Sequence, residues 1–283
     1  MNGVILGLAS ALLWGVADFG VRFASRQAGA FRALFYTQLV GLLALSLVIG
    51  AWPLPTLDGA VAALGLGLGL INVAGALFLY RAFAVGIVAL VSPIAASGNT
   101  VAVVIALLAG ERPTVLRLAG IAVTTLGVLL ASTDLRGLRD KPLVGAGTGL
   151  ALAAAGLFGV SLWASSHVVA SAGAVWTTWG LRMVGLVVLA ALAIPLRQAL
   201  APPPRSTWRW LGPIGVLDVG AYLAYNAGVA SDYVAVVAVL SSLFSAVTVL
   251  LAWVVLRERL APGQWLGILL ILVGVALVGL PGD

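Results

Sequence analysis

The stretch GAFRALFYTQLVGL at residues 29–42 returns in altered form as GAVWTTWGLRMVGL at residues 173–186. Five positions are identical at a constant offset of 144 residues. A second match, at an offset of 147, pairs Glu111, Arg112, Gly120, Ile121, Gly127 and Val128 with Glu258, Arg259, Gly267, Ile268, Gly274 and Val275. The chain is therefore one unit used twice, and we place the two copies at residues 1–135 and 143–283.

The composition places the chain in a membrane. Of the 283 residues, 62% are hydrophobic and 8% are charged, and the mean hydropathy is +1.17. No water-soluble fold can bury that much apolar surface, because a soluble exterior needs many more polar residues. The apolar segments are continuous, whereas the strands of a membrane barrel alternate apolar and polar residues. We expect an all-α integral membrane protein that crosses the cytoplasmic (cell inner) membrane several times.

Charges, prolines and Asn/Asp clusters divide the chain into ten apolar segments of about 20 residues, the length that spans a bilayer. These segments are 3–24, 32–51, 58–82, 86–109, 114–133, 143–166, 174–196, 207–230, 234–256 and 262–281. Each copy then holds five spans, and because five is odd, the second copy enters the membrane from the opposite side. The prediction is ten transmembrane helices in two inverted five-helix repeats, an architecture typical of alternating-access transporters.

Basic residues set the orientation of the spans. One side of the membrane would carry twelve of them: Arg22, Arg26, Arg32, Arg81, Arg136, Arg139, Lys141, Arg197, Arg205, Arg209, Arg257 and Arg259. The other side would carry Arg112 and Arg117. The richer side faces the cytoplasm, and an even number of spans then places both termini outside. The net charge of +6 does not indicate a nucleic-acid partner, because the basic residues are spread over short loops.

Short motifs recur at defined places in the predicted spans. They are Leu13, Trp14 and Gly15 in the first, Ser92 and Pro93 in the fourth, Gly110 and Glu111 at its end, and Gly120 and Gly127 in the fifth. In this order they resemble the EamA module of the drug/metabolite transporter superfamily, and the resemblance covers the whole chain as two tandem modules. The second copy departs from the pattern at Phe158, Leu240 and Arg257.

This resemblance implies a ten-helix carrier of small organic solutes, often an exporter of amino acids or related metabolites. Carriers of this kind commonly have both termini in the cytoplasm. The charge distribution of this chain argues for the reverse orientation, with both termini outside.

Polar residues near the centre of a span are costly in hydrocarbon unless they are paired or line water. Asn72, Asn99 and Asp218 lie near the centres of their spans, and Arg182 lies close to the centre of the seventh. Asn72 and Asp218 occupy nearly equivalent places in the two copies, as do Gln38 and Arg182. Equivalent positions of inverted copies meet near the midplane, where transporters bind their substrates.

Aromatic residues add to this candidate site. Trp14 and Trp163 lie in corresponding spans of the two copies, and Tyr222 lies one helical turn beyond Asp218. An apolar wall with a few polar groups is the usual lining of a small-molecule site. We predict a central cavity between the first, third, fourth, sixth, eighth and ninth spans. The candidate substrate-binding residues are Trp14, Asn72, Asn99, Trp163, Arg182, Asp218 and Tyr222.

The charged residues also have structural interpretations. Arg182 and Asp218 can form an ion pair that holds two spans together, or one of them can contact the substrate or a coupling proton. Asp18 and Arg22 are four residues apart and can pair on one helix face. Glu111, at a helix end, is expected to form a cap or to pair with a nearby arginine.

The sequence offers no catalytic set and no metal site. It has no cysteine, a single histidine, His167, and no HExxH motif. We therefore expect no enzyme activity, no cofactor and no bound metal. The function that remains is secondary transport of a small organic metabolite across the lipid bilayer. A channel or facilitative pore is the alternative, because polar midplane residues also line pores.

The sequence leaves energy coupling and assembly open. Asp218 or Asp18 can carry a coupling proton if its surroundings favour the protonated carboxyl group. Transport down the gradient of the solute fits the sequence equally well. A monomer and a homodimer are both compatible with it.

Overall fold

The computed structural model describes residues 2–86, 88–132, 147–198, 200–256 and 262–280. Within these ranges the regular structure is entirely helical. The α-helices are α1 (Asn2–Ala28), α2 (Ala30–Ser46), α3 (Gly59–Val85), α4 (Val88–Leu108), α5 (Val115–Ser132), α6 (Thr148–Ala193), α7 (Trp208–Val229), α8 (Val234–Ser241), α9 (Phe244–Leu256) and α10 (Pro262–Gly279). Two short 3-10 helices accompany them, η1 (Ile49–Ala51) and η2 (Arg205–Thr207). The predicted all-helical class is confirmed.

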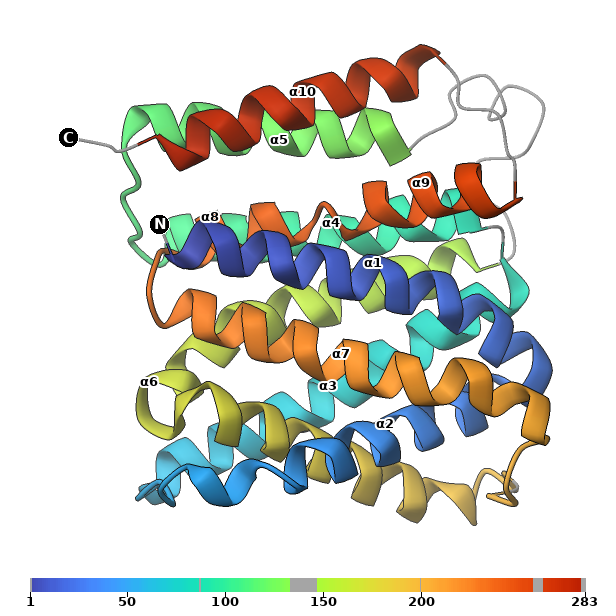
Figure 1. The fold of residues 1–283 in the computed structure, drawn as a ribbon. Helices are drawn as coiled ribbons and strands as arrows, with labels where there is room; N and C mark the ends of the chain where they lie inside the picture. The colour runs from blue at the N-terminus through green and yellow to red at the C-terminus, as the bar shows by residue number, and fades with distance from the viewer. Residues whose placement is uncertain (1, 87, 133–146, 199, 257–261, 281–283) are drawn as a thin grey trace.

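The helices run along one common direction, and the start of α1 and the end of α10 lie at the same end of the bundle (Figure 1). We call this the terminal end, and it also holds the connections from α2 to α3, from α4 to α5 and from α7 to α8. The other end is called the opposite end. Five helical stretches in the described ranges are long and apolar enough to cross a membrane, and shorter apolar helices accompany them. The count of ten spans stays a prediction.

The chain turns at a single glycine in two places, once between α1 and α2 and once inside α6. Gly29 has φ 82° and Gly173 has φ 74°, values that favour glycine over residues with a Cβ. These two glycines are equivalent in the sequence repeat. Helix α6 therefore has two arms, 148–172 and 174–193. The expected end of the sixth span at residue 166 is wrong, because the one-residue turn lets the first arm continue to 172 and include His167.

The predicted ninth span, 234–256, consists of two helices. Helix α8 ends at Ser241 and α9 begins at Phe244, so that Ser242 and Leu243 interrupt the regular structure. Every residue of α8 is buried. This short helix thus lies in the interior of the bundle, in contact with α1, α4 and α7.

Glycines set very close helix contacts, and some of these contacts form reciprocal pairs. Gly69 of α3 lies so near Val184 of α6 that an added Cβ would be 2.6 Å from the valine Cβ. Gly215 of α7 makes the same contact with Val40 of α2, at 2.7 Å. Val184 is the equivalent of Val40 at the 144-residue offset, and Gly215 follows Gly69 by 146 residues, between the two offsets of the repeat. Such an exchange of partners is expected when a twofold axis relates two copies.

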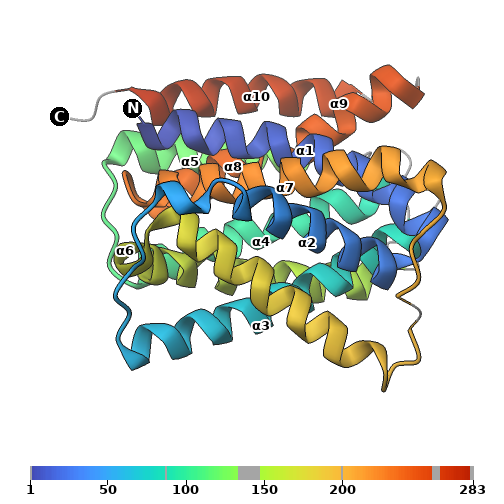
Figure 2. The same cartoon turned by 60° about the horizontal axis from the view of Figure 1, so that its bottom comes forward.

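Helices α5 and α10 lie together along one edge of the bundle (Figure 1). Their backbones touch: a Cβ added to Gly274 would lie 2.6 Å from the backbone nitrogen of Thr124. A Cβ added to Gly127 would lie 2.9 Å from the carbonyl oxygen of Gly267. Figure 2 shows α3 and the second arm of α6 crossing at the edge away from α10. Small residues allow this close packing, which stabilises helix pairs in lipid.

Candidate functional site

A cavity lies in the middle of the bundle. Its wall is formed by α1, α2, α3, α4, both arms of α6, α7 and α9. Six of the seven predicted binding residues line it: Trp14, Asn72, Asn99, Arg182, Asp218 and Tyr222. The predicted wall omitted the second and seventh spans, which contribute Gln38 of α2 and Arg182 of the second arm of α6. Substrate binding by these residues stays a prediction.

An ion pair connects the second arm of α6 to α7 inside this cavity. Arg182 Nη1 lies 2.6 Å from Asp218 Oδ2, and the same nitrogen donates to Gln38 Oε1. The other carboxylate oxygen of Asp218 accepts a 2.9 Å hydrogen bond from Trp14 Nε1. The Arg182 side chain is 4% exposed and that of Asp218 is 22% exposed. The arginine is therefore embedded in the wall, whereas the carboxylate faces the cavity.

Tyr222 links the ion pair to the neighbouring helices. Its ring lies 4.8 Å from the guanidinium carbon of Arg182, within the range of a cation–π contact. Its hydroxyl oxygen accepts a 2.7 Å hydrogen bond from Asn72 Nδ2, which lies 3.3 Å from Ser161 Oγ. Trp14 packs edge-on against Tyr222 with ring centroids 5.0 Å apart. Hydrogen bonds among Asn72, Ser161 and Tyr222 thus connect α3, α6 and α7 at their centres.

Asn99 and Trp163 differ in their relation to the cavity. Asn99 of α4 lines it and donates 2.9 Å hydrogen bonds to the carbonyl oxygen of Ala238 and to Ser241 Oγ, which ties α4 to α8. Trp163 does not line it: its ring packs against His167, with centroids 4.7 Å apart. At the 144-residue offset the equivalent of Trp14 is Phe158, and that ring does line the cavity.

Asp18 is a cavity residue that the sequence interpretation assigned to another role. It was expected to pair with Arg22, but among the described residues it forms neither an ion pair nor a hydrogen bond, and it lines the cavity at 8% exposure. Its position one helical turn after Trp14, on the same face of α1, is the signal that pointed there. No group of three or more His, Cys, Asp or Glu side chains suited to a metal ion occurs in the described ranges.

The cavity extends from the middle of the bundle toward the opposite end. Val21 of α1 and Tyr80 of α3 line it, and both lie in the later parts of helices that begin at the terminal end. Leu34 of α2 and Ile214 of α7 also line it, and both lie in the first halves of helices that begin at the opposite end. These four residues lie between the central ion pair and the opposite end, so the cavity extends toward that end.

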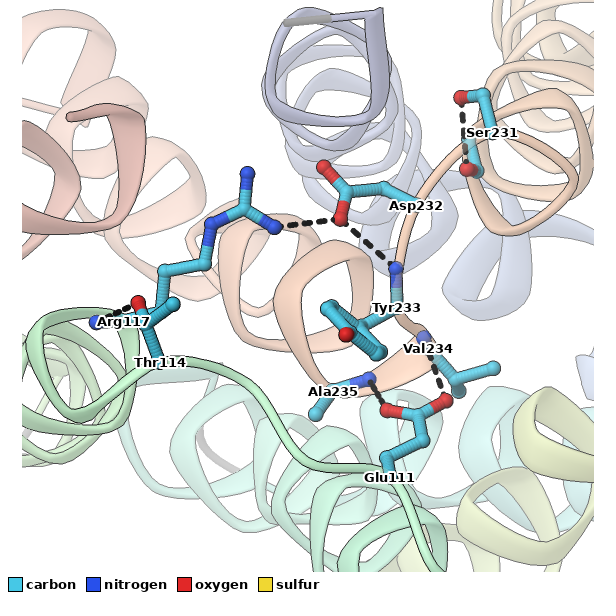
Figure 3. Close-up of polar contacts among 9 residues, drawn as sticks. Glu111, Thr114, Arg117, Ser231, Asp232, Tyr233, Val234 and Ala235 are labelled. Atoms are coloured by element: carbon cyan, nitrogen blue, oxygen red, sulfur yellow. Dashed lines mark hydrogen bonds and ion pairs between the residues drawn. The ribbon is translucent and has the colours of Figure 1, made fainter. Parts of the chain in front are cut away.

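Polar contacts join the two copies at the terminal end (Figure 3). Glu111 follows α4 in the chain. Its carboxylate accepts hydrogen bonds of 2.8 Å from the backbone amide of Val234 and 3.0 Å from that of Ala235. Arg117 of α5 pairs at 2.7 Å with Asp232, which precedes α8. We call these contacts the latch. Glu111 thus caps the first turn of α8, where the helix dipole favours a negative charge, rather than pairing with an arginine.

An all-helical bundle of apolar helices with a polar site at its centre has the form of a membrane transporter. The model of the EamA-like transporter family matches residues 1–133 and 145–280, one module in each copy of the repeat. The chain belongs to this family. It is therefore a multi-pass membrane protein and a transporter of the drug/metabolite type, whose partners are a small-molecule substrate and the lipid around it.

Solved structures share this fold. One crystal structure of a protein matches 98% of this chain and 96% of its own, with a TM-score of 0.71 at 22% sequence identity. In all, 25 chains of solved structures match. At this level of identity the likeness shows the fold alone. No curated protein matches the chain.

Proposed function

We propose that this protein is a secondary transporter that moves a small organic metabolite across the cytoplasmic membrane by alternating access, as an exporter of amino acids or related compounds. One observation carries the proposal: the cavity holds a buried ion pair at mid-bundle and leads to one end, while the latch joins the two copies at the other. A carrier needs a central site that faces one side at a time. No enzymatic role is proposed.

The reciprocal packing of the copies supports an inverted repeat. The contact of Gly69 with Val184 and that of Gly215 with Val40 exchange the roles of the two copies. If the twofold axis that relates the two copies lies in the membrane plane, the copies can exchange their conformations. The terminal end then opens and the opposite end closes, through contacts equivalent to those seen here. The two copies then provide the two end states of transport.

The test of the carrier proposal is counterflow into proteoliposomes. Vesicles loaded with an unlabelled solute are diluted into labelled solute, from a panel of amino acids, amines and nucleosides. A carrier is expected to accumulate label transiently for at least one solute, because outward movement of the unlabelled solute returns the site to the outside. A channel or facilitative pore gives simple equilibration without an overshoot, and that result for every transported solute would contradict the proposal.

The latch is expected to control access to the cavity from the terminal end. The chain has no cysteine, so Ala17→Cys provides a single thiol in the cavity wall. Adding Arg117→Gln removes an ion pair worth about 1 kcal/mol. We expect labelling of the thiol from the terminal side by a membrane-impermeant maleimide to become roughly fivefold faster.

Arg112→Gln is the matched control for this experiment. Arg112 lies on the same connection as Glu111, and its side chain donates to carbonyl oxygens of Leu107 and Glu111 instead of to the second copy. The substitution Arg112→Gln removes one positive charge, as Arg117→Gln does, but leaves the latch intact, so the labelling rate should stay near that of the parent. Equal rates for the Arg117 and Arg112 variants would show that the latch does not hold this end closed.

A further inference from the structure

We propose that the cavity selects solutes that carry an amine cation, and that the Asp18 carboxylate is the group that pairs with this cation. The inference rests on the carrier function proposed above and narrows its substrates, from amino acids and related compounds to the related amines. It follows from the charge balance of the wall, the position of Asp18 and the aromatic rings around it.

The charge balance leaves one carboxylate without a partner. The charged side chains that line the cavity are Asp18, Arg182 and Asp218. The guanidinium of Arg182 is used by Asp218 and Gln38. Two carboxylates thus share the wall with one cation that is already paired. An ionised buried carboxylate without a partner is strongly unfavourable, and either a proton or a cationic solute relieves this cost. The wall therefore favours a cationic occupant over an anionic one.

Asp18 is placed to meet that occupant. It is 8% exposed, and the surface it retains faces the cavity, one turn of α1 beyond Trp14 toward the opposite end. No described residue donates a hydrogen bond to its carboxylate or pairs with it. Arg22, the nearest arginine along the helix, lies with its guanidinium carbon 5.8 Å from the ring of Phe23. The carboxylate is therefore free for a ligand that enters from the opposite end.

The wall around Asp18 suits an organic cation. Aromatic side chains from several helices line the cavity: Trp14, Tyr80, Phe158, Tyr222 and Phe244. Aromatic faces attract ammonium groups and also pack against the apolar body of an amine. A carboxylate on the solute finds no exposed cation in this wall, because Nη1 of Arg182 contacts Asp218 and Gln38, and its Nε and Nη2 are buried away from the cavity. The site thus favours an amine over the corresponding amino acid.

The test compares ligands that differ in one charged group. Phenethylamine, 2-phenylethanol, phenylalanine and 3-phenylpropionate are titrated into the purified full-length protein in detergent, and binding is measured by calorimetry. We expect phenethylamine to bind at least about tenfold more tightly than each of the others, the value of one charge-assisted hydrogen bond. With Asp18→Asn, the preference for amine over alcohol should fall below about twofold.

Two variants keep this result interpretable. Asp18→Glu retains the carboxylate and should retain the preference for the amine, even if the asparagine variant folds poorly. Asp58→Asn removes a carboxylate that caps the exposed start of α3 through the amide of Val61, outside the cavity, and should bind as the parent does. The inference is wrong if phenylalanine or 3-phenylpropionate binds as tightly as phenethylamine, if no amine binds, or if Asp18→Asn keeps the preference.

Counterflow with labelled phenethylamine separates this inference from the carrier proposal. Amine binding that depends on Asp18, without counterflow of any solute, would overturn the carrier and leave the binding site standing. Counterflow of another solute, without binding of any amine, would overturn the amine site and leave the carrier standing.

Discussion

Replacing Asp218 with leucine is expected to lower the free energy of unfolding by about 3–5 kcal/mol, the cost of stranding one member of a buried ion pair. The Arg182 side chain is 4% exposed and would keep its charge inside the wall without the carboxylate. Only Gln38 would then accept from it. The unfolding of each variant can be followed in mixed micelles as the fraction of a denaturing detergent is raised.

The reverse replacement, Arg182→Met, should cost less, about 1–3 kcal/mol. Asp218 is 22% exposed to the cavity and keeps the hydrogen bond from Trp14, so its charge can be hydrated. The double variant should be more stable than Asp218→Leu alone, because neither charge is then left without its partner. A double variant whose loss equals the sum of the two single losses would show that the pair is not coupled.

The milder change Asp218→Asn separates stability from function. Asparagine keeps a single carbonyl oxygen, which can accept from either Trp14 or Arg182, and it removes the negative charge. We expect this variant to be expressed and to lose less stability than Asp218→Leu, because it keeps one acceptor, while its counterflow rate falls. Parental transport of every solute in the panel would remove Asp218 from the candidate site and leave only the carrier assignment.

The second large effect is expected at the contact between α5 and α10. Gly274→Leu would place a Cβ 2.2 Å from Thr124 Oγ1 and 2.6 Å from the backbone nitrogen of the same residue, so the helices must separate. We expect a loss of ~3 kcal/mol or more, the upper range for overpacking, because the backbone of α5 cannot rotate away as a side chain would. The measurement is the same unfolding assay, together with the yield of monodisperse protein.

Gly263→Leu is the matched control, because it makes the same change in the same helix. A Cβ at Gly263 meets nothing within 4 Å, so this variant should unfold near the parent. If both leucine variants unfold alike, the close approach of α5 and α10 does not contribute to stability.

Much of the fold was predictable because two features of the sequence report it directly. Long apolar stretches give the helices, and the recurrence of glycines such as Gly120 and Gly267 gives the duplication. The boundaries were less predictable. A turn of one residue at Gly173 leaves no polar loop to mark it, and the break after Ser241 lies in a continuously apolar segment. Hydropathy reports where a chain avoids water, and it does not record where its backbone bends.

The candidate site was predictable where burial of polar groups in lipid left few choices. Asn72, Arg182 and Asp218 had to face one another or a cavity, and they do. Trp163 was predicted to line the cavity because it is a tryptophan in the span that corresponds to that of Trp14. The residue at the position equivalent to Trp14 is Phe158, and Phe158 lines the cavity. Asp18 was predicted to pair with Arg22 because the two are four residues apart on one helix. This spacing contains no information about the neighbouring helices, which form the cavity beside Asp18.

The repeat is nearly symmetric in its packing and unequal in its chemistry. The first copy supplies Asp18 to the cavity where the second has Leu162, and the second supplies Arg182 where the first has Gln38. A solute that arrives from the cytoplasm therefore meets different surroundings from one that arrives from outside. For a carrier without ion coupling, the half-saturating concentrations at the two faces should then be unequal. Such a carrier leaves the solute at equal concentrations on the two sides at equilibrium. The ratio of its maximal rates in the two directions must therefore equal the ratio of the two half-saturating concentrations.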